Sequence, residues 1–587
     1  MHSHIRPHTH VALRLPSGIL KIVELKPNTN IFLGKFGTFN SNLLLGRPYY
    51  NTYELLDKDD GKKTAELRVV PAAELHAEAV GDGHAPPPAA EEADESAEGG
   101  AGFDIVGADG EVIMRNNRLT VDDATRQTLT MEEIEELKKA GTGSGKEIIA
   151  KIMASHQAIS EKTAFSLAKY TLRKSRKFLR RFTALPLDVG KLAEHILEKE
   201  AYRIMELREE SLGLISSWSN VHYGATSRVL TAEDGVSQIG GGRWLVVDDT
   251  GGLVVAALAE KMGLLYPTEE SDDTSDEDEE PTASPSNDQQ TPTDTAMPDA
   301  DPTDASNRPR KPPRPHIPQM SAYTNTLTIL HPNNQPNLAC LKYFGYDVGQ
   351  PSTAHPLYKH LKSLSWLSLI APEDDPSYIE PELLSATELE NMKSSKRGNY
   401  YKKRRRWEKT KRVVDETKRG GFDGLVVATS MDVKGVLKEL VPLVRGGGKV
   451  VVYHQNVEPL VKLVDCYSKE RRAAFIAREF GESGQNGKRA LEENGDADED
   501  EDFPVNPTLL LAPSLQTARA RQWQVLPERT HPMMTSKGGA EGYLFTATRV
   551  IPVEGRVEAR GHGTRKKRKT AVETPAETSA AETPVEA

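Results

Sequence analysis

A basic stretch between Lys162 and Arg181 has the residue types that bind phosphate groups. It carries eight Lys and Arg side chains and three aromatic rings, and the bases at 169, 173, 176, 177 and 180 recur at i, i+3, i+4 spacing. This spacing puts them on one face of a helix, where like charges repel unless a polyanion neutralises them. We therefore predict nucleic-acid binding by Lys162, Phe165, Lys169, Tyr170, Arg173, Lys174, Arg176, Lys177, Arg180 and Arg181. The alternative is a solvated helix face.

A second basic stretch, 396–407, interleaves bases with Tyr400, Tyr401 and Trp407. Aromatic rings can stack on unpaired nucleotide bases while the cations contact the backbone. We assign RNA binding here to Lys402, Lys403, Arg404 and Arg405. One such run alone is more often a solvated face or a nuclear-import signal. Two runs, both with aromatics, favour a nucleic-acid partner.

The sequence 244–252, WLVVDDTGG, predicts a strand, a glycine turn and the start of a helix. In Rossmann-like folds this turn binds a nucleotide or S-adenosylmethionine, because bare backbone amides and a helix N-terminus face the ligand. A methyltransferase would carry Gly-x-Gly-x-Gly here, but only Gly251 and Gly252 follow Asp249, and bulky residues come next. We interpret these as degenerate cofactor positions.

Two later strand ends depart from the same cofactor-binding pattern. The strand that should end in a ribose-binding acid ends in His331, and the strand that should end in a catalytic cluster ends in Ala428, Thr429 and Ser430. Three departures at three independent positions favour a methyltransferase fold that has lost its cofactor site, and the alternative is an α/β domain that never bound a cofactor. We therefore predict neither catalytic nor cofactor-binding residues in this chain.

A glycine-rich loop at 141–146 resembles a phosphate-binding loop only superficially. Ala140 replaces the first glycine and Glu147 stands where a Ser or Thr would ligate magnesium. An amphipathic helix precedes the loop, whereas a nucleotide loop follows a strand. We predict a turn between two helices.

Metal, disulfide and membrane roles find little support in the sequence. Four histidines within residues 2–10 lack a second shell of ligands, and we predict no metal site. Two cysteines cannot build a disulfide framework, which indicates a reducing compartment. No apolar run approaches the ~18 residues of a membrane span. We expect a soluble intracellular protein without membrane contact.

The elements that must position these residues change character along the chain. Short strands with glycine breaks over 11–70 predict a small barrel or sandwich. Helical patterns follow from Thr130, which begins a capping box with Glu133. From about 191 apolar strands alternate with helices, which predicts a parallel α/β sheet.

Charge is divided unevenly among these regions. The 587 residues carry 75 bases and 86 acids, a net charge of −11. The segments 72–102, 268–307, 492–502 and 570–587 hold 34 of the acids and no base, so 52 acids and 75 bases leave about +23 on the remainder. A basic body interrupted by acidic, low-complexity insertions is compatible with an anionic partner.

The predicted fold class is α/β with an N-terminal all-β domain: a small β-barrel, a helical linker and a degenerate Rossmann-like methyltransferase fold with long disordered insertions. The first domain covers 1–125, with a disordered acidic insertion at 72–102, and a helical basic RNA-binding segment covers 126–190. The α/β domain covers 191–551, with insertions at 268–322, 373–420 and 481–504. A disordered tail, 552–587, contains the basic cluster 565–569.

Several segments together resemble the family of the non-catalytic subunit of the tRNA (adenine-58-N1)-methyltransferase. They are 117–123 (NRLTVDD), 145–149 (GKEII), 162–170 (KTAFSLAKY) with the basic run behind it, and 524–532 (QVLPERTHP) with 542–544. The match runs along most of the chain outside the acidic insertions. It adds Arg529 and His531 to the expected RNA-binding residues.

The resemblance implies a role and a partner. The expected function is a non-catalytic, tRNA-binding subunit that forms a heterotetramer, two of each, with a catalytic paralogue. That paralogue is expected to bind S-adenosylmethionine, and this chain is expected to bind no cofactor. Residues 565–569, RKKRK, match a nuclear-import signal, so we expect the protein in the nucleus. The alternatives are an active S-adenosylmethionine-dependent RNA methyltransferase and a nuclear RNA-associated scaffold.

Overall fold

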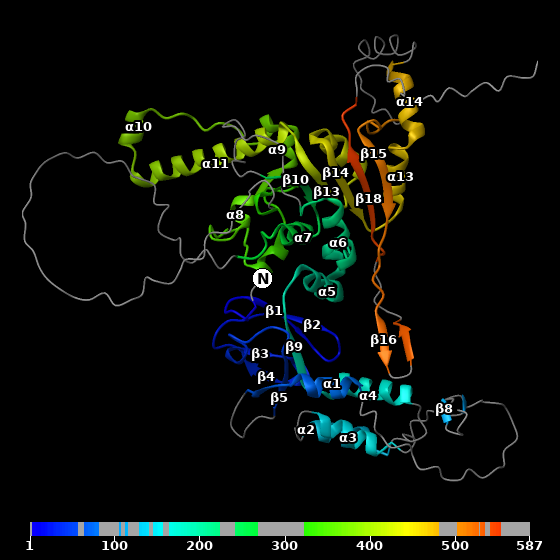
Figure 1. Cartoon of the computed structure of the whole chain (residues 1–587). Helices are drawn as coiled ribbons and strands as arrows, with labels where there is room; N and C mark the ends of the chain where they lie inside the picture. The colour runs from blue at the N-terminus through cyan, green and yellow to red at the C-terminus, as the bar shows by residue number, and fades with distance from the viewer. Residues whose placement is uncertain are drawn as a thin grey trace, which may run out of the picture.

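A computed structural model shows a β-rich part, formed mainly by the N-terminal residues, and an α/β part (Figure 1). The structure describes residues 3–56, 64–80, 105–106, 112–114, 128–139, 145–156, 164–222, 241–267, 322–480, 502–526, 529–533 and 540–552. The two parts meet through β2 (Leu20–Glu24) and α5 (Val189–Glu200), where His195 Nδ1 lies 2.8 Å from the Leu20 carbonyl oxygen.

The N-terminal part is built on a five-stranded antiparallel sheet in the order β2-β1-β9-β5-β6. Its other strands are β1 (His10–Arg14), β5 (Thr52–Leu55), β6 (Leu67–Val69) and β9 (Arg181–Pro186). The central strand β9 contributes Phe182, whose ring stacks on Phe39 and Tyr53 at centroid distances of 5.0 and 5.5 Å. The described strands leave β2 and β6 at the edges and do not confirm closure into a barrel.

Smaller elements complete this part. They are β3 (Asn30–Phe32) paired with β4 (Thr38–Asn40), the helix α1 (Ala72–Val80), and β7 (Ile105–Val106) paired with β8 (Val112–Met114). The prediction that 72–102 is a disordered insertion is wrong for 72–80, because α1 supplies Glu74 to an ion network described below.

Three helices pack beside the N-terminal sheet: α2 (Met131–Lys139), α3 (Lys146–Ala154) and α4 (Ala164–Phe178). Ile148, Ile149, Ile152 and Phe178 form their shared core. The predicted capping box is confirmed, since Glu133 N donates to Thr130 Oγ1 at 3.3 Å and Thr130 N donates to a Glu133 carboxylate oxygen at 2.8 Å. The predicted helical segment 126–190 needs one correction: 181–186 is the central strand β9 of the first sheet.

The α/β part contains a seven-stranded sheet in the order β12-β11-β10-β13-β14-β18-β15. Strands β10 (Arg243–Asp248), β11 (Thr326–His331), β12 (Leu361–Ser365), β13 (Phe422–Ala428) and β14 (Val444–His454) are parallel. The strands β18 (Tyr543–Arg549) and β15 (Leu510–Gln516) are added antiparallel to their neighbours. The parallel strands follow the doubly wound order 3-2-1-4-5, whose switch point lies between β10 and β13.

Helices cover both faces of this sheet. Successive residues of β10 point to opposite faces and all of them are buried, so both faces must be covered. Trp244 and Val246 share a core with α5, α6 (Glu209–Trp218) and α7 (Leu253–Met262). Leu245 and Val247 share the opposite core with α11 (Ser394–Lys418), α12 (Val433–Leu440) and α13 (Glu458–Cys466). The remaining helices are α8 (Leu357–His360), α9 (Trp366–Ile370), α10 (Ala386–Asn391) and α14 (Lys469–Phe480).

The predicted insertion 373–420 is wrong for its second half. Residues 394–418 form the long helix α11, whose last turns bury Val413, Val414 and Thr417 against the sheet. Within the described residues, no helix is both long and apolar enough to span a membrane. The predicted segments 268–321, 481–501 and 553–587 lie outside the described residues.

A two-stranded ribbon, β16 (Trp523–Leu526) and β17 (Arg529–Pro532), extends from the α/β part towards α4 (Figure 1). Strand β16 pairs with β17, while β18 pairs with β14 and β15. The ribbon therefore connects the two parts of the molecule.

Candidate nucleic-acid interface and remnant of a cofactor site

The acid at the end of β10 is used to hold the protein together. Asp248 is buried, and its carboxylate accepts hydrogen bonds from Thr250 N at 2.7 Å and from Val255 N, in the first turn of α7, at 3.0 Å. Burial raises the pKa of Asp248, although these hydrogen bonds oppose the shift. Asp248 thus fixes the turn and the helix that follow it.

The glycine turn itself is covered by another segment of the chain. Gly251 and Gly252 have positive φ of 69° and 88°. A side-chain carbon at Gly252 would lie 2.9 Å from Leu338 Cα, and Cys340 N donates to the Gly251 carbonyl oxygen at 2.9 Å. The glycines bring residues 338–340 close to the turn. The backbone surface that a bound cofactor would need is therefore packed by the protein.

The neighbouring strand end closes the same edge of the sheet. Asp249 accepts hydrogen bonds from Thr429 Oγ1 at 2.6 Å and Ser430 N at 3.0 Å. These are the residues that we predicted at the degenerate cofactor and catalytic positions, and the fold brings them into contact. One carboxylate oxygen of Asp249 is thus engaged by the two residues that follow β13.

His331, at the end of β11, is also turned to the protein. Its ring nitrogen Nδ1 lies 2.5 Å from the Asn333 carbonyl oxygen, and burial lowers its pKa. Across the described part of the chain, no group of three His, Cys, Asp or Glu side chains is placed to hold a metal ion.

The glycine at position 145 of the glycine-rich loop is required by the packing of α3 against α4. It has φ of +88° and begins α3, and a side-chain carbon there would lie 2.3 Å from the Phe178 carbonyl oxygen at the end of α4. The next residue, Lys146, forms an ion pair with Glu74. Gly145 thus permits close contact between two helices, as predicted for a helix linker.

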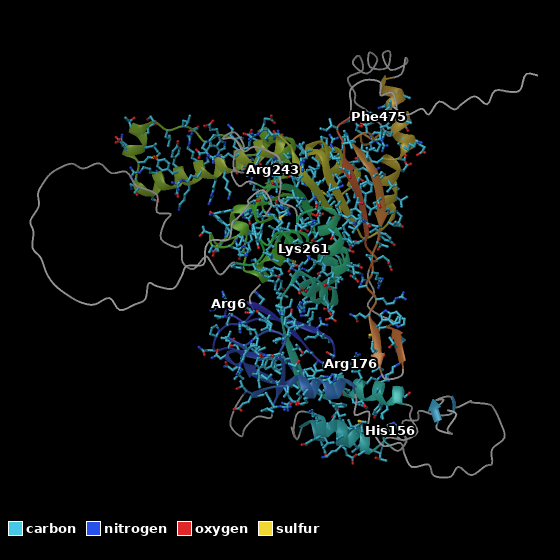
Figure 2. All side chains as sticks on the ribbon, in the orientation of Figure 1. Arg6, His156, Arg176, Arg243, Lys261 and Phe475 are labelled. Atoms are coloured by element: carbon cyan, nitrogen blue, oxygen red, sulfur yellow. The ribbon has the colours of Figure 1, made fainter. Side chains whose placement is uncertain are left out.

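Helix α4 presents part of the predicted basic surface. Arg173, Arg176 and Lys177 are exposed, while Lys169 and Lys174 are half-buried. Burial, followed by repulsion from Lys177, lowers the pKa of Lys174. Figure 2 shows Arg176 at this end of the molecule. Exposed cations on one helix without acidic residues between them form a surface suited to phosphate groups.

The aromatic residues of this stretch have structural roles. Tyr170 packs beside the core of the three helices, with its ring 5.4 Å from that of His156, and Lys174 Nζ lies 4.8 Å from the Tyr170 ring centroid. Phe178 is buried in the same core. Lys162 and the side chain of Phe165 lie outside the described residues.

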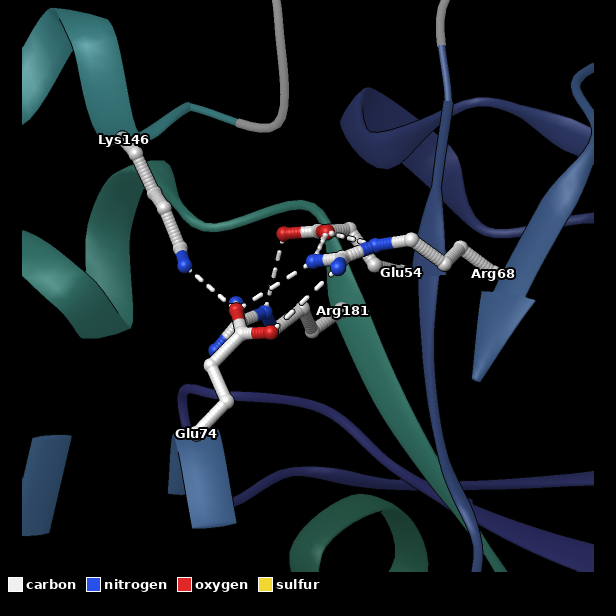
Figure 3. Close-up of polar contacts among 5 residues, drawn as sticks. All are labelled: Glu54, Arg68, Glu74, Lys146 and Arg181. Atoms are coloured by element: carbon white, nitrogen blue, oxygen red, sulfur yellow. Dashed lines mark hydrogen bonds and ion pairs between the residues drawn. The ribbon is translucent and has the colours of Figure 1, made fainter. Parts of the chain in front are cut away.

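Arg181 is not an RNA-binding residue, and this prediction is corrected. Its side chain is 4% exposed, and it donates from Nε to Glu54 at 3.0 Å and from Nη2 to Glu74 at 2.8 Å (Figure 3). The helical pattern ends at α4, and β9 carries Arg181 into the sheet. The preceding Arg180 is half-buried, with its Nε 3.4 Å from the Phe36 carbonyl oxygen.

The ion network around Arg181 joins the N-terminal sheet to the helices. Arg68 contacts both Glu54 and Glu74, and Lys146 contacts Glu74 (Figure 3). The hydrogen bond from Lys146, with help from Arg68, lowers the pKa of Glu74 to about 2. Burial acts to raise the pKa of Glu54, but Arg68 and Arg181 outweigh it and the pKa is lowered. Both carboxylates are therefore charged and hold α1, α3, β6 and β9 together.

The second predicted stretch lies on α11, at the other end of the molecule from α4 (Figure 1). Lys402, Lys403 and Arg405 are exposed. Arg404 is half-buried, with ion pairs to Glu408 at 3.4 Å and Glu380 at 3.8 Å. The structure therefore does not bring the two basic stretches together.

The ribbon β16–β17 does join the surface around α4. β16 lies beside α4, and β17 carries Arg529 and the partly exposed His531. The side chain of Arg529 lies outside the described residues. Trp523 and Val525 were not among the predicted residues, although they are 57% and 73% exposed on one face of β16. Their i, i+2 spacing within a polar segment was the available signal.

Comparison with known proteins agrees with these observations. Residues 4–393 match the Gcd10p family. The chain is 48% identical to the tRNA (adenine(58)-N(1))-methyltransferase non-catalytic subunit trm6 of Aspergillus oryzae, over 98% of this chain and 97% of that protein. It is 47% identical to the subunit of the same description from Aspergillus fumigatus, over 98% of both chains.

A solved structure, the tRNA (m1A58) methyltransferase TrmI from Aquifex aeolicus, aligns with 94% of this chain and 100% of its own, at 8% identity and a TM-score of 0.34. The family match and the two fungal relatives confirm the resemblance noted in the sequence. The chain belongs to the Gcd10p family.

Proposed function

We infer that this chain is the non-catalytic subunit of a tRNA (adenine-58-N1)-methyltransferase, and that it binds tRNA and leaves the chemistry to a partner chain. The observation that carries the inference is the closed turn after β10. Leu338 packs against Gly252, and Asp249 is held by Thr429 and Ser430. A sheet of this type binds its ligand at the switch point, and here the protein itself takes that space.

The tRNA-binding surface that we propose is α4 with the adjoining ribbon. The exposed bases Arg173, Arg176 and Lys177 supply charge, and Lys169 and Lys174 extend it. Contacts of this kind act mainly on the phosphate backbone and position the RNA without reading its sequence. The end of the helix is set in place by its close contact with Gly145 at the start of α3 and by β9, which follows it in the chain.

The partner that we propose is a catalytic paralogue that supplies S-adenosylmethionine, in a heterotetramer with two of each chain. The description of the Aspergillus proteins as non-catalytic subunits supports a catalytic partner. We place the complex in the nucleus on the basis of the sequence 565–569.

The test compares the chain alone with the chain in its complex. Titration calorimetry with S-adenosylmethionine should give no binding heat for the purified chain, and the chain alone should not methylate tRNA. Adding the catalytic partner should restore both cofactor binding and formation of N1-methyladenosine. Methylation at catalytic rates by the chain alone would refute the proposal and favour an active enzyme. Recovery from cells without any methyltransferase partner would favour a scaffold.

A further inference from the structure

Helix α11 is anchored firmly at one end. Glu416 lies near its C-terminus and is 3% exposed, and Lys362 Nζ from β12 lies 3.0 and 2.9 Å from its two carboxylate oxygens. Arg243 at the start of β10 lies 3.1 Å from the same carboxylate through Nε and donates from Nη1 to the Gly420 carbonyl oxygen at 2.8 Å. These buried contacts tie α11 to the sheet, whereas its N-terminal half projects from the body (Figure 1).

One face of the projecting half is covered by the segment before it. Trp407 Nε1 donates to the Tyr378 carbonyl oxygen at 2.8 Å, and Leu384 N donates to Tyr400 Oη at 3.4 Å. Arg404 pairs with Glu380 on the same side. The covered positions 400, 404 and 407 follow i, i+4, i+7 spacing, so they form one stripe of the helix.

The opposite face carries a second stripe of exposed cations, and Lys409 Nζ in this stripe lies 5.8 Å from the centroid of the Tyr358 ring of α8. Lys402, Arg405, Arg406 and Lys409 are all exposed and follow i, i+3, i+4, i+7 spacing. Within the described residues, none of these four side chains forms an ion pair. At a rise of 1.5 Å per residue the stripe spans roughly 10 Å.

Four cations in this arrangement repel one another. Like charges at i, i+4 destabilise a helix. The helix keeps its shape because Trp407 and the buried Glu416 hold it from the other face and from its end. A linear polyanion laid along the stripe would relieve the repulsion, and its counterions would be released on binding.

We propose that the stripe Lys402, Arg405, Arg406 and Lys409 is a second RNA-binding site, which contacts a part of the tRNA backbone that α4 does not reach. The proposal rests on the proposed function of the chain as a tRNA-binding subunit. It adds a separate contact at the opposite end of the molecule and identifies Lys409, outside the predicted run, as one of its residues. The rigid anchor means that little ordering of the helix is needed on binding.

The experiment measures the salt dependence of tRNA affinity with the full-length chain in its complex with the catalytic partner. The probe is an unmodified tRNA transcript. The stripe variant combines Lys402→Ala, Arg405→Ala, Arg406→Ala and Lys409→Ala. Each lost phosphate contact reduces the log–log slope by roughly 0.7–0.9. We expect the slope to fall by roughly 3 and the affinity at moderate salt to fall at least tenfold.

Two control variants distinguish the loss of a specific binding site from a general decrease in the positive charge of the protein. A charge-preserving variant with Lys402→Arg, Arg405→Lys, Arg406→Lys and Lys409→Arg should keep the parental slope. A second control variant loses the same charge elsewhere, by replacing the exposed Lys199, Lys261, Lys462 and Lys469 with Ala. This variant should change the log–log salt slope by less than half a unit. Thermal unfolding shows whether each variant is folded.

A variant of α4, measured in the same way, distinguishes failure of the second RNA-binding site from failure of the proposed function. It replaces Lys169, Arg173, Lys174, Arg176 and Lys177 by Ala. If the α4 variant loses affinity and the folded stripe variant does not, the second site is refuted and the proposed function stands. If neither variant changes the slope, RNA binding by both helices is refuted. If the stripe variant keeps its RNA affinity but loses the catalytic partner, the stripe is a protein-binding surface and our assignment is wrong.

Discussion

Arg181 holds the N-terminal sheet together from inside, whereas Arg176 lies on the surface of the same basic run. Arg181 satisfies Glu54 and Glu74, and its side chain is almost entirely buried. Arg176 is exposed near the end of α4. The difference comes from one event in the backbone: the helix ends at Phe178 and the strand β9 begins at Arg181.

Replacing Arg181 by Ala should lower the free energy of unfolding by about 3 kcal/mol, because it leaves Glu54 buried with one fewer cation. Arg176→Ala should leave the unfolding free energy unchanged within about 0.5 kcal/mol and should reduce the salt slope of tRNA binding instead. Urea denaturation and salt-dependent binding of the same two variants measure this. Equal stability of the two variants would mean that the ion network contributes nothing.

At the scale of elements, local sequence signals predicted the helices α2 and α4 but missed the strand β9. The capping box at Thr130 and the spacing of bases in 169–180 are local patterns, and both helices form as expected. Strand β9 follows directly after a run of basic residues that predicts a helix. Its strand conformation depends on pairing with β1 and β5, more than 120 positions away, and context of this kind overrides local propensity.

The candidate site was predictable to the same extent. The glycine turn and the end of β13 were expected at one edge of a parallel sheet, and Asp249 does contact Thr429. The packing of Leu338 against the glycine turn was not predictable from the sequence. Leu338 follows the long segment 268–321, and nothing in the local sequence marks it as a neighbour of Gly252. The buried pairing of Glu416 with Arg243 and Lys362 was hidden for the same reason.

The packing of α3 on the end of α4 gives a prediction about one element. Gly145→Ala should lower the free energy of unfolding by about 2 kcal/mol or more, because the left-handed φ opposes a side chain and the added carbon would overlap the Phe178 carbonyl oxygen. Gly213, in the middle of α6 with nothing within 4 Å, is the matched control. Gly213→Ala should be neutral or stabilising by up to about 1 kcal/mol. Chemical denaturation of both variants measures the difference. Equal decreases in the free energy of unfolding would contradict the packing role of Gly145.

The basic surfaces of α4 and α11 lie at opposite ends of the protein, with the two sheets between them (Figure 1). An RNA that touches both binds as a bivalent ligand, so the second contact forms at a high effective concentration. A full-length tRNA is an elongated ligand of this kind, whereas a short RNA hairpin can occupy one surface at a time.

We therefore expect the parental complex to bind a full-length tRNA transcript at least ~100-fold more tightly than a short hairpin cut from it. Neutralising either helix should remove most of that advantage while changing the affinity for the hairpin little. Binding isotherms with the two RNAs and the two variants provide the measurement. If the hairpin binds as tightly as the tRNA, the two surfaces do not act together.

The central position of β9 also governs how the protein is made. β1 and β5 pair with β9 across 127 to 175 positions of sequence, so the first sheet cannot close until residue 186 has left the ribosome. At a synthesis rate of roughly 10 residues per second, β5 waits on the order of ten seconds with its pairing groups unsatisfied. During that interval the nascent chain has exposed strand edges of the kind that aggregate. The first sheet therefore depends on residues up to 186, and a ribosome that stalls before β9 would release a chain unable to build its first core.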